Sequence, residues 1–129
     1  MAIAAVACLS VLVIIFALIA NFTKEKPVNG VKSITVDVVY NEVSKNTFYF
    51  DTDAEYLSEV LEKATLIEGE DGEFGIFVTT VNGITADTEN EEWWRFSRNG
   101  EVLNTGIDKV AVKDGDSFAI ELIVGYENY

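Results

Sequence analysis

The chain has 129 residues, enough for about one domain, and an apolar content of 49% is sufficient for a single core. Its 22 acidic and 9 basic residues give a net charge of −13, and none of them lies in the first 22 positions. A surface this acidic repels polyanions, which excludes nucleic acid as a partner.

Residues 1–22 form an uncharged, almost continuously apolar run. As a helix this run would be roughly 33 Å long, which matches a hydrocarbon core of roughly 30 Å. We therefore predict a transmembrane anchor, with a cleaved signal peptide as the alternative because both contain such a run.

Lys24 and Lys26 follow the run and favour a cytoplasmic domain by the positive-inside rule. No cysteine follows Cys8, and short N-terminal anchors are frequent on exported domains, so we predict an extracytoplasmic domain, secreted if the segment is cleaved.

Residues 23–32 contain the only proline and an Asn-Gly pair, and we predict a linker there, followed by a domain over residues 33–126. From Ile34 to Tyr40 apolar residues alternate with others, which predicts a strand with one buried face. The short run Thr47 to Phe50 predicts its hairpin partner.

Thr52-Asp53-Ala54-Glu55 has the spacing of a capping box, which places a helix N-terminus there. Apolar residues then recur at helical spacing as far as Ala64, which predicts a helix. The acidic, glycine-containing stretch Glu68 to Glu73 is typical of a loop.

The second half of the domain predicts strands separated by turns. Phe74 to Val81, Trp93 to Ser97 and the alternating run Phe118 to Val124 favour strands. Asn82-Gly83 and Asn99-Gly100 favour tight hairpins, and Asp114-Gly115 another turn. The order predicts an α+β domain with a mixed or antiparallel sheet on one helix, an order that resembles a β-grasp.

Few groups in the chain suit catalysis, because it contains no histidine and only one cysteine, so we predict that it is not an enzyme. Asp51, Asp53 and Glu55 are clustered oxygen ligands that suit Ca²⁺, as are the acids between Glu68 and Glu73. The alternative is that Asp53 and Glu55 favour a helix N-terminus and that the other acids are solvated.

The pair Trp93-Trp94 is the strongest candidate for a binding contact. On a strand Trp94 and Phe96 share one face and Trp93 and Arg95 the other, so one tryptophan should be core, and we predict that Trp94 and Phe96 fill the interior. Trp93, on the same face as Arg95, either stacks on a planar or apolar partner or covers a sheet edge or a helix.

Several motifs occur together in one known family. They are Val81-Asn82-Gly83-Ile84-Thr85-Ala86-Asp87, Trp93-Trp94-Arg95-Phe96 with Asn99-Gly100-Glu101, Thr105-Gly106-Ile107-Asp108, and Val112-Lys113-Asp114-Gly115-Asp116. With them, residues 33–124 resemble the transcobalamin-like C-terminal domain family. The resemblance implies a β-grasp-like fold and, in the vitamin carriers, a domain that covers one face of cobalamin. Those carriers have a second, helical domain, for which this chain has no room.

We therefore predict a membrane-tethered, extracytoplasmic binding module for a small ligand, corrinoid-like in chemistry, contacted by Trp93, Trp94 and Arg95. The alternatives are a surface domain that recognises a protein or glycan through a sheet edge, and a Ca²⁺-binding surface domain.

Overall fold

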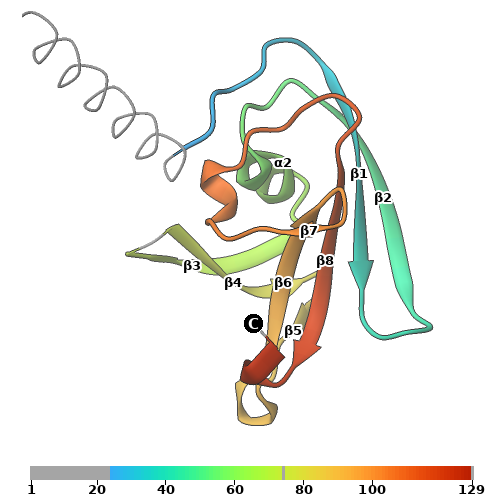
Figure 1. Cartoon of the computed structure of the whole chain (residues 1–129), viewed down its shortest axis with the longest axis vertical. Coiled ribbons are helices and arrows are strands. Elements are labelled where there is room, and N and C mark those ends of the chain that lie inside the picture. Colours follow the sequence, from blue (N-terminus) through green and yellow to red (C-terminus); the bar gives the residue numbers. More distant parts are fainter. Residues whose placement is uncertain (1–23, 74, 129) are drawn as a thin grey trace, which may run out of the picture.

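The computed structural model describes residues 24–73 and 75–128, shown in Figure 1. The predicted anchor over residues 1–22 lies outside the described residues. Among the described residues no helix is long and apolar enough to cross a membrane. The strands are β1 (Lys32–Val39), β2 (Lys45–Thr52), β3 (Ile67–Gly72), β4 (Gly75–Val81), β5 (Ile84–Thr85), β6 (Glu92–Arg98), β7 (Glu101–Val102) and β8 (Ser117–Val124). The helices are α2 (Leu57–Lys63) and the 3₁₀ turns η1 (Thr88–Asn90), η2 (Ile107–Lys109) and η3 (Tyr126–Asn128).

Two sheets and one short α-helix make up the domain. The larger sheet has the order β2-β1-β8-β6-β7, with β1 and β8 parallel and the other neighbours antiparallel. The smaller sheet, β3-β4-β5, is antiparallel and crosses behind β6 in Figure 1. The predicted α+β class with a mixed sheet and one helix is confirmed, but the strands divide between two sheets.

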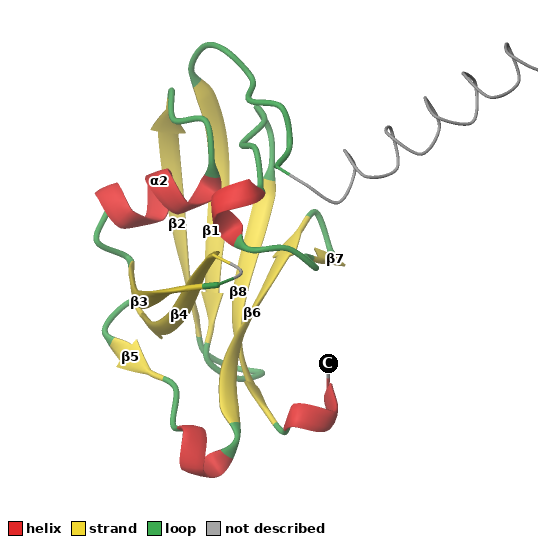
Figure 2. Ribbon diagram, turned by 90° about the vertical axis from the view of Figure 1, so that its left-hand side faces the viewer, coloured by secondary structure: helices red, strands yellow, loops and turns green. Residues whose placement is uncertain are grey.

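The core lies where α2 and the smaller sheet cover one face of the larger sheet, and Figure 2 shows α2 in front of β1 and β2. Alternate side chains of the central strands fill it, as the sequence pattern requires. The helix contributes its apolar stripe. The buried apolar residues of β1, α2 and β8 are Ile34, Val36, Val38, Leu57, Val60, Leu61, Phe118 and Ile120.

Both predicted Asn-Gly hairpins are confirmed. Asn82 and Gly83 join β4 to β5 with φ angles of 49° and 79°, and Asn99 and Gly100 join β6 to β7 with 50° and 86°. Two successive residues of positive φ are characteristic of the type I′ turn, which Asn-Gly adopts readily.

Two sequence predictions are wrong. The stretch Glu68 to Glu73 is not a loop, because residues 67–72 pair with β4 as β3; all of them except Ile67 are exposed, so the acids stay solvated on a strand. The capping box does not form either, because β2 continues through Thr52. The Thr52 hydroxyl accepts from the Ala54 amide at 3.0 Å, and α2 begins only after Tyr56, without a side-chain cap.

Most of the predicted linker is bound to the domain. The Glu25 carboxylate accepts hydrogen bonds from both terminal nitrogens of Arg98, at 2.8 and 2.9 Å, and from the Ala111 amide at 2.9 Å. The Tyr56 hydroxyl donates to the Glu25 carbonyl at 2.8 Å. Lys32 is buried, and its ammonium donates to the carbonyls of Val28 at 2.6 Å and Ala54 at 2.8 Å. The predicted linker is therefore held against the domain at Glu25 and Lys32.

Candidate functional site

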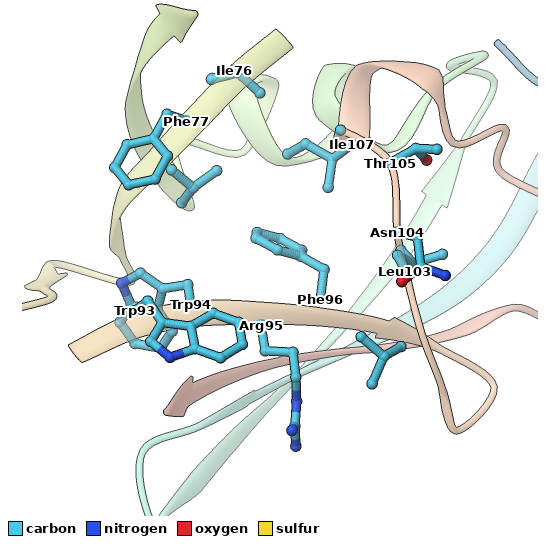
Figure 3. Close-up of a pocket in the computed structure, with 13 residues that line it drawn as sticks. Ile76, Phe77, Trp93, Trp94, Arg95, Phe96, Leu103, Asn104, Thr105 and Ile107 are labelled. Atoms are coloured by element: carbon cyan, nitrogen blue, oxygen red, sulfur yellow. The ribbon is translucent and has the colours of Figure 1, made fainter. Parts of the chain in front are cut away.

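A groove of about 730 Å³ opens between the two sheets. Its walls are residues 76–78 of β4, residues 93–96 of β6 and residues 102–107, which lead from β7 into η2. Figure 3 shows Phe96 at its centre, with Phe77 on one side and Ile107 across from it. The lining is mainly apolar and aromatic, as in most binding sites for small molecules.

Trp94 joins the two sheets at the inner end of the groove. Its side chain is buried, and its indole N–H donates to the Thr79 carbonyl of β4 at 3.1 Å. The expectation that Trp94 is a core residue is confirmed. Phe96, two residues along the same face of β6, is only partly buried and leaves its ring available to the groove.

Trp93 and Arg95 of β6 also line the groove, but their polar groups contact β8 and the residue that follows it. The indole N–H of Trp93 donates to the Gly125 carbonyl at 3.1 Å. An Arg95 guanidinium nitrogen lies 3.3 Å from the Glu121 carboxylate of β8, and Figure 3 shows this side chain extending away from Phe96. The Arg95 Nε is buried without a hydrogen-bond partner. Trp93, Trp94 and Arg95 thus all line one groove. The face of β6 that carries Trp94 and Phe96 forms the floor of this groove.

The two lips of the groove carry exposed apolar side chains that the sequence analysis did not select. Phe77 of β4 is 61% exposed, and Val102 of β7 is 50% exposed. Asn104 and Thr105 follow Val102 and supply exposed polar groups. The sequence gives one indication of this role for Phe77. In the run Ile76-Phe77-Val78 of β4, Phe77 occupies the solvent-facing position, where alternation predicts a polar residue.

The wall opposite β6 is fixed by residues 103–108. The Leu103 amide donates to the Phe96 carbonyl at 2.8 Å, and Ile107 is buried in the core. The Asp108 carboxylate lies directly against Gly75, where a Cβ atom would collide with it. One Asp108 oxygen is buried without a hydrogen-bond partner. Gly75 has a φ of 112°, so its backbone and its packing both favour glycine.

The predicted Ca²⁺ ligands Asp51, Asp53 and Glu55 are not brought together. Within residues 24–73 and 75–128 no group of three or more His, Cys, Asp or Glu side chains could hold a metal ion. Asp51 is the last residue but one of β2 and accepts from the Ser33 hydroxyl at 2.6 Å.

The ion pair between Glu25 and Arg98 shifts the pKa of both groups. Two hydrogen bonds from Arg98 hold the pKa of Glu25 below its ordinary value, against an opposing effect of burial, and the Ala111 amide adds to the lowering. The same contact raises the pKa of Arg98. The pair fixes residue 25 beside Ala111, close to the end of η2.

Comparisons with known proteins identify the family. A family model described as "Domain of unknown function (DUF4430)" matches residues 54–123. A crystal structure of a putative metal binding protein from Ruminococcus gnavus is similar with 48% identity and a TM-score of 0.71, over 74% of this chain and 99% of that one. The chain therefore belongs to the DUF4430 family.

A second solved structure, haptocorrin in complex with Cbi, is similar with a TM-score of 0.58 at 18% identity. The match covers 78% of this chain and 27% of haptocorrin, so the chain spans about a quarter of that protein. At this identity the likeness concerns the fold. A search of curated proteins gave no significant match.

Proposed function

We propose that the domain binds a small, largely apolar ligand in the groove between β4, β6 and residues 102–107. The observation that carries the proposal is the groove itself: its volume of about 730 Å³ lies within the range of about 300–1,000 Å³ typical of ligand sites. Phe77 and Val102 are exposed on opposite lips, where a ligand would cover both.

Charge limits the chemistry of this ligand. The net charge of −13 disfavours an anion, and the nearest guanidinium, Arg95, is paired with Glu121. A neutral or cationic ligand with a broad apolar surface fits these conditions. Asn104 and Thr105 would supply the few polar contacts that fix its orientation.

A corrinoid is the first ligand to test, because haptocorrin, whose fold is similar over part of its length, has been solved with Cbi, cobinamide. Because the groove is open, a corrinoid bound in it would contact the domain on one of its faces and leave the other face exposed. A metal ion is a poorer candidate, because the described residues contain no suitable group of ligands. The apolar residues 1–22 would hold the module at an extracytoplasmic membrane surface, or be cleaved from a secreted form.

The test is a titration of residues 24–129 with cobinamide and cobalamin, in which binding is measured by calorimetry and by tryptophan fluorescence. This fragment contains the whole described core, and the 48% identical relative was solved as a chain matching only 74% of this one. Both tryptophans line the groove, so a bound corrinoid should quench their emission saturably.

Phe77→Ala should weaken binding about tenfold, because removal of an aromatic contact from a ligand costs on the order of 1–2 kcal/mol. Tyr49→Ala is the matched control, since Tyr49 is 80% exposed on β2, at the opposite edge of the larger sheet. The absence of saturable binding by either corrinoid up to about 1 mM would refute a corrinoid as the ligand.

A further inference from the structure

β2 is an edge strand with an uncovered row of main-chain groups. Within the part of the chain that the structure describes, its only neighbour is β1, and Figure 1 shows it along the side of the molecule away from β3 and β4. The strand has eight residues and includes Tyr49, which is 80% exposed. An edge of this length pairs readily with another strand unless it is protected.

The register of the hairpin shows which groups are free to pair. The Tyr40 amide donates to the Ser44 carbonyl at 2.9 Å, so in the antiparallel ladder the even-numbered residues of β2 exchange hydrogen bonds with β1. The amides and carbonyls of the odd-numbered residues then point to the open edge. These residues are Lys45, Thr47, Tyr49 and Asp51.

The same four residues are complementary to a second copy of themselves. In an antiparallel pair related by a two-fold axis through Phe48, Lys45 of one copy lies directly opposite Asp51 of the other, twice by symmetry. Thr47 then lies opposite Tyr49, and up to about eight main-chain hydrogen bonds form.

We propose that the domain forms a symmetric dimer through β2, with its two-fold axis at Phe48, so that the two larger sheets become one continuous sheet. The partner is a second copy of this chain.

Charge selects this register over its neighbours. A shift of the axis to Thr47 removes Asp51 from the paired region and sets Lys45 against Tyr49. A shift to Tyr49 sets Thr47 against Asp51 and Lys45 against Asp53. Only the axis at Phe48 pairs both charged residues with opposite charges, and opposite charges across a strand pair are favourable.

The side chains are free to make these contacts. Lys45 is 62% exposed and lies 3.9 Å from Asp37, a loose pair that a second carboxylate can join. Asp51 uses one oxygen to accept from Ser33, which leaves the other for a partner. On the inner face Phe48 is only partly buried and stacks on Phe50 with ring centroids 6.4 Å apart. Across the axis it would meet the Phe48 of the second copy.

Long-range repulsion between two acidic domains does not prevent this pairing. The acids between Glu68 and Glu73 lie on β3 and the turn after it, on the side of the molecule away from β2 (Figure 1). Charges separated by more than a Debye length, about 8 Å at physiological ionic strength, are largely screened. The Lys45 and Asp51 contacts are at close range and are screened less.

The test is sedimentation of residues 24–129 from about 10 µM to about 1 mM, where a weak dimer forms reversibly. Lys45→Asp and Asp51→Lys each set like charges opposite one another at both symmetric contacts, and each should weaken self-association about tenfold or more. An equimolar mixture of the two variants restores both contacts, so it should form mixed dimers. The double variant with both exchanges should again self-associate.

A proline variant tests the hydrogen bonds separately. Tyr49→Pro removes an amide that points to the open edge and donates no hydrogen bond to β1, so the melting temperature should change little while the dimer is lost. A monomer at all concentrations, or a dimer that the mixture and the proline variant leave unchanged, overturns the proposal. Corrinoid binding in the groove does not depend on this edge and can succeed or fail independently.

Discussion

Glu25 is expected to stabilise the domain although it precedes every helix and strand of the described residues. In Glu25→Gln one acceptor oxygen becomes an amide nitrogen that cannot accept from Arg98, and the remaining hydrogen bonds from Arg98 and Ala111, of 2.8–2.9 Å, lose the negative charge of their acceptor. An unmade hydrogen bond to a charged group costs about 1.5–3 kcal/mol when buried. The Glu25 side chain is 36% exposed, so we reduce the expected total to about 1–2 kcal/mol. For a domain of this size that lowers the melting temperature by about 5–10 °C.

The stabilisation by Glu25 should depend on pH in a defined direction. The folded-state pKa of Glu25 is lowered, first by the hydrogen bonds from Arg98, so the unfolded chain binds this proton more readily than the folded one. The stabilisation is therefore fully present above the ordinary glutamate pKa of about 4.3 and is lost as pH falls through the lower folded value. Glu25→Gln cannot lose it, so the stability difference between the two proteins should close at acid pH.

The assay is urea unfolding of residues 24–129 as wild type and as Glu25→Gln, from about pH 3 to about pH 7, with the free energy of unfolding extrapolated to water. Glu42→Gln is the control, because Glu42 is an exposed carboxylate in the turn between β1 and β2. A Glu25→Gln variant as stable as wild type at pH 7, or a difference that persists unchanged at pH 3, would refute the reasoning.

Three further substitutions test single sites by thermal and urea unfolding. Lys32→Met keeps the buried stem but leaves the Val28 and Ala54 carbonyls without their ammonium donor, and we expect a loss of about 2–3 kcal/mol; a neutral result would mean that water satisfies both carbonyls. Gly69→Ala places a Cβ atom against the Phe77 carbonyl across β3 and β4, and we expect about 1–3 kcal/mol of destabilisation. Asn82→Gly, in a turn that either residue suits, should by contrast change stability by less than about 1 kcal/mol.

The predictable part of the fold came from periodicity and turn chemistry. Alternation in β1 and β8 identified the buried face of the larger sheet, and Asn82-Gly83 and Asn99-Gly100 fixed two hairpins. These signals are local, because side-chain direction and positive φ are properties of adjacent residues. Trp94 was predicted as core for the same reason.

The parts that were missed depend on contacts distant in sequence. β3 consists mostly of exposed acidic residues and is a strand only because β4 pairs with it. Glu25 and Arg98 are separated by 73 residues, so nothing near residue 25 indicates that it is fixed. Phe77 and Val102 are candidate contacts only because the fold places β4 and β7 on opposite sides of one groove.

Glu25 also connects the start of the described chain to the wall of the groove. Its amide donates to the Lys109 carbonyl at 3.0 Å, at the end of η2, and its carboxylate accepts from Ala111. The same 3₁₀ turn begins at Ile107, which forms the groove wall across from Phe96. Loosening of residue 25 would therefore free the segment after η2 from one of its supports. Because ligand affinity depends on a preformed wall, Glu25→Gln should weaken binding in the groove as well as stability, whereas Glu42→Gln should change neither.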